Sequence, residues 1–357
     1  MLGILFFTLM LLGFTKFFTS PNSTQNKLFF GVIGVLVFVS IYWNIEYFDD
    51  MYNYQYMFNN IDSYNTDVIF TSLVRLANRI GLTFEDLYNF HIVIMALFFC
   101  LFASRFSNNI IVILALICVF RYVDYGNQIR FYMGFFFILN ALYEYLVKER
   151  KISSIILAIL AILCHSSLVV LLLIPFFKDF LFKLSLKRTI IINIILLVFF
   201  NFLTLIISNI FPQFLKYFTE EKGKSSIIGG VFELFPLIFV VWLIVSTHNY
   251  VFRVNRSFYD NNNYRFLYTL CNFSFLFIST GLVFRILANR FVLSFSLVWI
   301  CYLLYTLNMY KKGDVLIQKF KIVTYFVILI FWFYYASLFV LGSSYNLEEA
   351  LKMLQIN

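Results

Sequence analysis

The chain has 357 residues, of which 62% are apolar and 13% are charged, and its mean hydropathy is +0.87. This composition excludes a water-soluble globular protein with an ordinary charged surface. The net charge of +9 does not indicate nucleic-acid binding, because Lys and Arg occur in short clusters between apolar segments, as in the cytoplasmic loops of membrane proteins. We therefore expect an integral membrane protein with no nucleic-acid partner.

Apolar segments long enough to cross a membrane recur along the whole chain. About 20 helical residues span the hydrocarbon core, where each backbone polar group must be bonded within the protein. The sequence predicts an all-α, polytopic bundle of about twelve transmembrane helices, forming a single membrane domain over residues 1–357. In chain order the expected helices are Leu2 to Phe18, Leu28 to Ile45, Leu87 to Ser104, Asn109 to Val123, Phe131 to Val147, Ile152 to Cys164, Ser166 to Phe177, Thr189 to Ile210, Ile227 to Thr247, Tyr264 to Phe284, Phe291 to Met309 and Ile322 to Leu341.

Clusters of basic residues set the expected orientation, because such clusters face the cytoplasm. They are Lys148/Arg150/Lys151, Lys178/Lys183/Lys187/Arg188, Arg253/Arg256/Arg265 and Lys311/Lys312/Lys319/Lys321. The first two clusters can both face the cytoplasm only if residues 152–177, which lie between them, cross the membrane an even number of times. We prefer a short hairpin with His165 near its outer apex to one long tilted helix. The same count predicts two outer loops, residues 46–86 and 212–226.

The first outer loop is acidic and contains a helical repeat. Residues 46–86 include seven acidic and two basic side chains. Its apolar residues Phe70, Leu73, Val74, Ala77 and Ile80 recur at helical spacing, and Arg75, Asn78 and Arg79 share the opposite face. We expect a short amphipathic helix that lies in the outer, periplasmic interface.

Arginines dominate the polar residues that border helices on the predicted outer face. They are Arg75, Arg79, Arg121, Arg130, Arg285 and Arg290. Cationic side chains there oppose the topology bias and are costly near lipid unless they are paired or functional. For one arginine alone, an ion pair or contact with lipid phosphate is the simpler explanation. For the set we favour a diphosphate ligand, which a planar guanidinium binds with two hydrogen bonds, and Gln128 adds donors beside Arg130.

Two places offer a group that could accept a proton. His165 interrupts an apolar stretch, and an imidazole exchanges protons near neutral pH. Its structural alternative is a hydrogen bond to a neighbouring carbonyl group. Asp49 and Asp50 begin the outer loop, and Asp50 shares a helical face with Tyr54, so the pair could orient a sugar hydroxyl. Their simpler interpretation is that of solvated loop acids.

These residues, in this order, resemble the EpsG family of exopolysaccharide and O-antigen polymerases. The resemblance is carried by Asp49/Asp50 with Asn53 and Tyr54, by Asn127 to Arg130, by His165 to Leu168, and by Arg285 with Arg290. The family's first motif more often reads as a Gly-Thr-Asp-type turn. The chain departs from it here, and both Asp49 and Asp50 stay candidates.

The resemblance implies a metal-independent membrane glycosyltransferase of the Wzy type, with a fold similar to the GT-C class and no cofactor. Such an enzyme transfers a glycan from undecaprenyl diphosphate to a lipid-linked repeat unit, at the outer face of the bacterial cytoplasmic (inner) membrane. Its implied partners are these lipid-linked glycans, membrane lipids, a chain-length regulator and a flippase.

The implied chemistry divides the candidate residues into two groups. Arg130, Arg285 and Arg290 would stabilise the departing diphosphate, with Arg75 or Arg79 in support, and His165 or Asp50 would accept the proton of the sugar hydroxyl. The alternatives are a flippase for lipid-linked oligosaccharides, an O-antigen ligase and a membrane acyltransferase. A flippase is expected to have two similar halves, which the sequence does not display.

Overall fold

A computed structural model describes residues 27–43, 49–61, 67–107, 110–210, 227–282 and 290–339. Every regular element within these ranges is helical, so the predicted all-α class is confirmed for them. The described residues up to Phe176 form one compact unit, and those from Phe177 onward form a second.

Several helices have the apolar character of membrane-spanning segments. In the described part of the chain, Phe84–Ser104 and Leu237–Val254 are long and apolar enough to cross a bilayer, and Phe30–Tyr42, Lys151–Cys164 and Leu293–Met309 are shorter apolar helices. The expected helix Leu2 to Phe18 lies outside the described residues, and the number of crossings, about twelve, stays a prediction.

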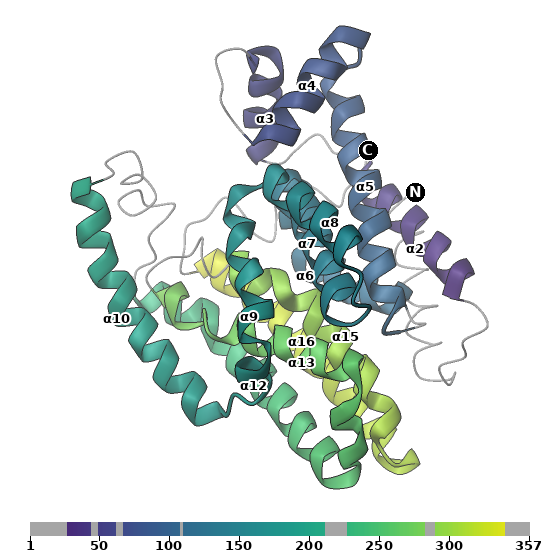
Figure 1. Cartoon of the computed structure of the whole chain (residues 1–357), viewed down its shortest axis with the longest axis vertical. Helices are drawn as coiled ribbons and strands as arrows, with labels where there is room; N and C mark the ends of the chain where they lie inside the picture. The colour runs from purple at the N-terminus through teal and green to yellow at the C-terminus, as the bar shows by residue number, and fades with distance from the viewer. Residues whose placement is uncertain are drawn as a thin grey trace. The chain divides into compact units, whose positions relative to one another are not determined.

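The first unit is a bundle of packed helices with one amphipathic helix at its end (Figure 1). Helix α5 packs against both α2 and α7, and α8 lies along α7. Its elements are α2 (Lys27–Tyr42), α3 (Asp49–Asn59), α4 (Val68–Ile80), α5 (Phe84–Ser104), α6 (Ile110–Asn127), α7 (Ile129–Leu146), α8 (Lys151–Cys164) and the 3₁₀ helix η3 (Ser166–Leu173). Aromatic rings fill much of the core, where Phe38, Phe99, Tyr125 and Phe136 are all fully buried.

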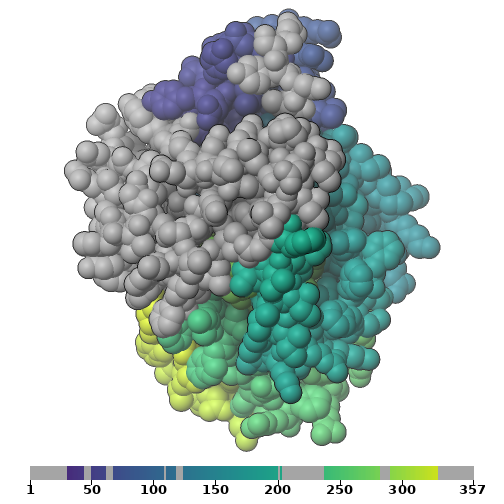
Figure 2. Space-filling view, turned by 90° about the vertical axis from the view of Figure 1, so that its left-hand side faces the viewer, coloured from purple at the N-terminus to yellow at the C-terminus, as the bar shows by residue number. Residues whose placement is uncertain are grey.

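Helix α4 confirms that this segment is an amphipathic helix, although Ile80, predicted on its apolar face, is exposed. Its position in the outer interface stays a prediction. Phe70, Val74 and Ala77 are buried on one face, whereas Arg75 and Arg79 are exposed on the other. The helix ends at Gly81, whose φ of 74° is a left-handed conformation that glycine adopts without strain. Helices α3 and α4 project beyond the amino-terminal end of α5, at the top of Figures 1 and 2.

The connections on either side of α7 differ from the sequence prediction. The polar run from Asp124 to Asn127, expected between two helices, is the last turn of α6, and Gln128 alone separates α6 from α7. Helix α8 ends at Cys164, and the backbone of His165 is extended before η3 begins. Residues 152–177 are therefore not one continuous α-helix, and the predicted break at His165 is confirmed.

The second unit contains longer helices joined by short 3₁₀ segments. Helix α12 packs against both α15 and α16, and α13 packs against α15. Its elements are α10 (Leu186–Ile210), α12 (Ile227–Val254), η5 (Arg256–Asp260), α13 (Asn262–Phe275), η6 (Ser279–Leu282), η7 (Leu293–Phe295), α15 (Ser296–Thr306), η8 (Leu307–Met309) and α16 (Lys312–Phe339), and α9 (Ile174–Phe182) contains the boundary between the units. Along α10, Ile190, Ile194, Ile195 and Val198 are exposed, as in a helix that faces lipid.

The expected helix Tyr264 to Phe284 is wrong at its carboxyl end, because α13 stops at Phe275. Asn193 of α10 replaces the missing helical bonds. Its Nδ2 donates to the carbonyl oxygen of Phe275 at 2.8 Å, and its Oδ1 accepts from the amide of Ser279 at 2.8 Å. A side chain 86 residues away in sequence from Ser279 thus ends the helix, which local hydrophobicity does not reveal.

Candidate functional site

Arg130, the second residue of α7, is held from several sides. Its Nη1 donates to Oδ2 of Asp67 at 3.1 Å, and its guanidinium carbon lies 4.9 Å from the ring centroid of Tyr54 and 5.2 Å from that of Phe70. The side chain is 18% exposed, so it is only partly accessible. Its Nε is buried and meets no hydrogen-bond acceptor within the described ranges. The guanidinium is therefore oriented by protein and still has unused donor capacity.

Asp67 directs its carboxylate to this arginine instead of to its own helix. It occupies the residue before α4, where an aspartate commonly accepts a hydrogen bond from the first-turn amides. Its side chain makes no such capping bond, although its carbonyl oxygen accepts from the amide of Thr71 at 3.1 Å. The carboxylate is 18% exposed, like its partner. Because its carboxylate accepts from Arg130, Asp67 is part of the arginine site.

Asp50 and Tyr54 of α3 lie at the junction of α6 and α7, next to Arg130. The amide of Asp50 donates to Oδ1 of Asn127 at 2.6 Å, and Asn127 is buried at the last position of α6. Tyr54, one turn after Asp50 on α3, is the residue whose ring lies near Arg130. The helical face shared by Asp50 and Tyr54 was predicted, and the structure joins it to the Asn127 to Arg130 segment.

His165, which follows α8, contacts the first turn of α7. Its Nδ1 is 2.8 Å from Oγ of Ser167, and its ring meets the edge of Phe131, the residue after Arg130, at a centroid distance of 5.4 Å. Gly134 lets α8 approach α7 closely here, because a Cβ atom at that position would lie 2.8 Å from the carbonyl oxygen of Ala161. Polar groups from α3, the start of α4, the α6–α7 junction and the end of α8 therefore gather near the amino-terminal end of α7.

Comparison with known proteins identifies the family of this chain. A family model described as the EpsG family matches residues 27–347. The chain belongs to the EpsG family. No curated protein and no solved structure matches it significantly. The usual role of the EpsG family is that of a Wzy-type polymerase, and membership together with the apolar helices indicates a membrane protein with a polysaccharide polymerase-like role.

Within this EpsG-family chain, the other predicted arginines are not joined to the cluster by the described contacts. Arg75 and Arg79 lie on the exposed face of α4, opposite the face that carries Phe70. Arg290 belongs to the second unit, where its carbonyl oxygen accepts a hydrogen bond from the hydroxyl of Ser294. Arg285 and the side chains of Arg121 and Asp49 lie outside the described residues.

Sequence reasoning missed two residues of the cluster. Asp67 precedes an amphipathic helix, which indicates a capping role, and nothing in the sequence links it to an arginine 63 positions later. The second residue is His91 of α5. It is fully buried, its ring lies 6.0 Å from that of Phe70, and its Nε2 meets no partner among the side chains that the structure describes.

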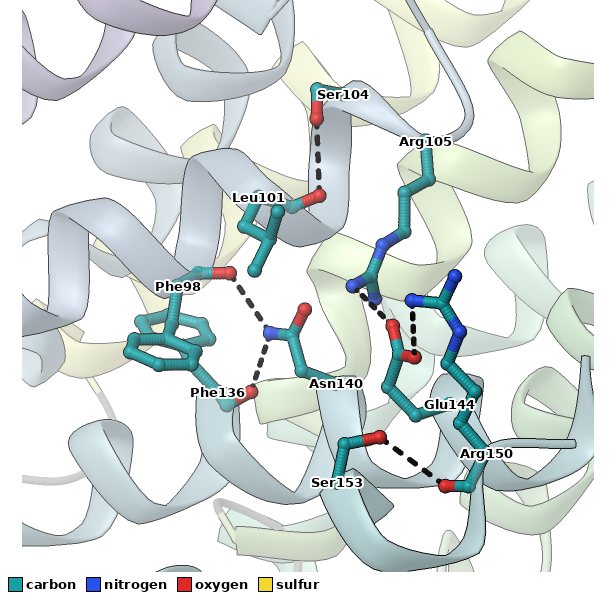
Figure 3. A network of polar contacts seen from close by, with 9 residues as sticks. All are labelled: Phe98, Leu101, Ser104, Arg105, Phe136, Asn140, Glu144, Arg150 and Ser153. Atoms are coloured by element: carbon teal, nitrogen blue, oxygen red, sulfur yellow. Dashed lines mark hydrogen bonds and ion pairs between the residues drawn. The ribbon is translucent and has the colours of Figure 1, made fainter. Parts of the chain in front are cut away.

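A second polar network lies at the opposite end of α7 (Figure 3). The carboxylate of Glu144 is 3.0 Å from Nη2 of Arg105 and 3.7 Å from Nη1 of Arg150; the first contact is a hydrogen bond and the second only an ion pair. Burial lowers the pKa of Arg105, and the charge of Glu144 acts in the opposite direction. One helix turn earlier, Nδ2 of Asn140 donates to the carbonyl oxygens of Phe98 and Phe136. These contacts fasten the carboxyl ends of α5 and α7 to the start of α8.

The second unit contains an aromatic cluster around His248. Its Nε2 is 2.6 Å from the hydroxyl of Tyr259 and its Nδ1 is 2.6 Å from that of Tyr264, while the ring of Tyr268 stacks on the imidazole at 3.7 Å. Burial raises the pKa of Tyr259. Because both imidazole nitrogens are bonded to phenols, the cluster is satisfied internally, and it is typical of a structural contact between α12 and α13.

Proposed function

We propose that this EpsG-family protein polymerises a bacterial polysaccharide, such as O-antigen, capsule or exopolysaccharide. In this proposal it transfers a growing glycan from undecaprenyl diphosphate to a lipid-linked repeat unit, at the outer face of the cytoplasmic membrane. The alternatives are a flippase for lipid-linked oligosaccharides and an O-antigen ligase.

The observation that carries the proposal is the setting of Arg130. Its guanidinium is fixed by Asp67 and by two aromatic rings, and it retains a buried donor. Glycosyl transfer from a diphosphate carrier leaves negative charge on the departing phosphate, and an oriented guanidinium in a site of reduced dielectric stabilises this charge. Arg285 and Arg290 are proposed to contribute further positive charge, with Arg75 or Arg79 in support.

The second requirement of the reaction is removal of a proton from the acceptor hydroxyl. His165 and Asp50 are the candidates from sequence, and Asp49, Tyr54 and Gln128 are proposed to contact the sugars. The backbone bond from Asp50 to Asn127 and the ring contact of His165 with Phe131 are consistent with sites close to the α6–α7 junction. The proposed reaction uses no metal and no cofactor.

Deletion of the gene tests the polymerase against its rivals. Loss of a polymerase leaves single repeat units on the lipid acceptor, whereas loss of a flippase leaves no repeat units outside the cell. Loss of a ligase leaves polymer on the carrier lipid and none on the final acceptor. The glycan ladder of the deletion strain, resolved by gel electrophoresis, distinguishes these outcomes, and a plasmid copy of the wild-type gene should restore long chains.

A further inference from the structure

Asp67 is the carboxylate that the structure bonds to Arg130. It belongs to neither of the two places that the sequence indicated for a proton acceptor, His165 and Asp49/Asp50. Its side chain bonds to the guanidinium and does not cap α4. The carboxylate therefore gives up the capping bond that an aspartate favours at this position.

A carboxylate on a diphosphate-binding arginine competes with the ligand for the same positive charge. The pair is 18% exposed on each side, so the ligand's phosphate can reach its rim from outside. When phosphate oxygens take up the guanidinium, the Asp67 carboxylate gives up its bond to Nη1 of Arg130. A carboxylate beside a guanidinium is a weak base, and it becomes a stronger one when that positive charge is neutralised by another anion.

We propose that Asp67 is the proton acceptor of the glycosyl transfer, held on Arg130 until the carrier's diphosphate displaces it. This inference rests on the proposed function, and it assigns to Asp67 the task for which His165 and Asp50 were the candidates from sequence. His165 then shapes the site through Phe131, and Asp50 fixes α3 to the α6–α7 junction.

The transfer balances without a co-reactant. The proton of the acceptor hydroxyl passes to the Asp67 carboxylate as the hydroxyl oxygen forms its bond to the anomeric carbon. The bond between that carbon and the diphosphate oxygen breaks, and its electron pair leaves with the diphosphate, whose charge Arg130 stabilises. When the carrier departs, Asp67 returns its proton to water and pairs with Arg130 again.

The opposite effects of one substitution on binding and on turnover provide the test. Asp67→Asn removes the competing charge and keeps a residue that is favoured before a helix. We expect this variant to bind undecaprenyl diphosphate about two- to fivefold more tightly, because the lost ion pair is partly exposed. We expect its chain growth to fall at least about 100-fold, in the range of a lost general base. Binding is measured on the purified full-length protein in detergent, and chain growth by the glycan ladder of the complemented deletion strain.

A matched pair in the second unit supplies the control. Asp179 accepts a hydrogen bond from Nη2 of Arg265 at 3.0 Å, and this pair is more exposed than that of Arg130. Asp179→Asn should leave both binding and the ladder unchanged. Asp67→Ser, which also keeps a favoured capping residue, replaces Asp67→Asn if the asparagine variant does not fold.

Normal chain growth in the Asp67 variant would overturn the proposal, and so would unchanged or weaker binding of the carrier. A failure of the proposed function is different, because the wild-type protein itself would then neither bind undecaprenyl diphosphate nor restore the ladder.

Discussion

At the residue scale, the candidate site depends on how one guanidinium is oriented. Arg130 contacts a carboxylate at its Nη1 end and two rings near its face, so few rotamers remain open to it. An arginine oriented in advance loses little side-chain entropy when an oxyanion binds. The sequence indicated this residue because it borders a helix, but its partner Asp67 precedes a different helix, α4, and could be found only from the fold.

We expect Arg130→Ala to reduce chain growth by about 100- to 1,000-fold, the usual cost of removing one donor that stabilises a developing oxyanion. Arg130→Lys should also be impaired, because an ammonium group cannot bind two phosphate oxygens as a planar fork. The glycan ladder gives the activity, and immunoblotting of membranes shows whether the variant is inserted.

Arg265 is a matched control for these variants, since it also pairs with an aspartate and lies 5.1 Å from the ring centroid of Phe182. Arg265→Ala should retain a normal ladder. Long chains in cells that carry Arg130→Ala would remove this arginine from the proposed mechanism.

At the scale of elements, sequence patterns predicted most helices and failed where a distant side chain decides their ends. The apolar repeat of α4 and the break at His165 follow from local sequence. The early end of α13 does not, because it depends on Asn193 of another helix. Tertiary contacts of this kind have no signal in the local sequence. The pairing of Asp67 with Arg130 could not be predicted for the same reason.

Gly134 controls the approach of α8 to α7, and its replacement should weaken the first unit. A Cβ atom there would lie 2.6 Å from Cδ1 of Leu168 and 2.8 Å from the carbonyl oxygen of Ala161, and backbone atoms cannot move aside cheaply. We expect Gly134→Ala to cost about 1–3 kcal/mol of stability, as overpacking usually does. A thermal melt of the purified protein in detergent measures the loss.

The control for this substitution is Gly313→Ala in α16, where a Cβ atom meets nothing within 4 Å. It should melt no lower than wild type, because alanine favours the helix. If Gly134→Ala melted at the wild-type temperature, the close contact between α7 and α8 would be wrong.

Asn193 gives a second test at this scale. Asn193→Ala leaves the carbonyl group of Phe275 and the amide of Ser279 without the bonds that end α13. An unsatisfied buried polar group costs about 1–3 kcal/mol, and we expect a comparable loss of stability in the same melting assay. Asn249→Ala, at an exposed position of α12, should have little effect; an equal effect of the two substitutions would contradict the assigned role of Asn193.

At the scale of the whole molecule, the distribution of charge along α7 sets the expected orientation. Arg130 and Glu144 lie about 21 Å apart along the helix axis, at about 1.5 Å per residue. The carboxyl-terminal end is next to the basic residues Lys148, Arg150 and Lys151, whereas the amino-terminal end is close to Asp67. The positive-inside rule therefore predicts that the Arg130 cluster faces the outside.

Cysteine labelling tests this orientation directly. Glu85, in the first turn of α5, is exposed at the end of the first unit that carries the Arg130 cluster, and Lys148 is exposed at the other end. Four of the five native cysteines, Cys100, Cys164, Cys271 and Cys301, are buried, which limits their background reaction. The fifth, Cys118, has a side chain outside the described part of the structure and is replaced by serine in the labelling strains. A membrane-impermeant maleimide should label Glu85→Cys in intact cells and Lys148→Cys only after the membrane is opened. The reverse pattern would put Arg130 in the cytoplasm, where a polymerase that extends glycans outside the cell could not use it.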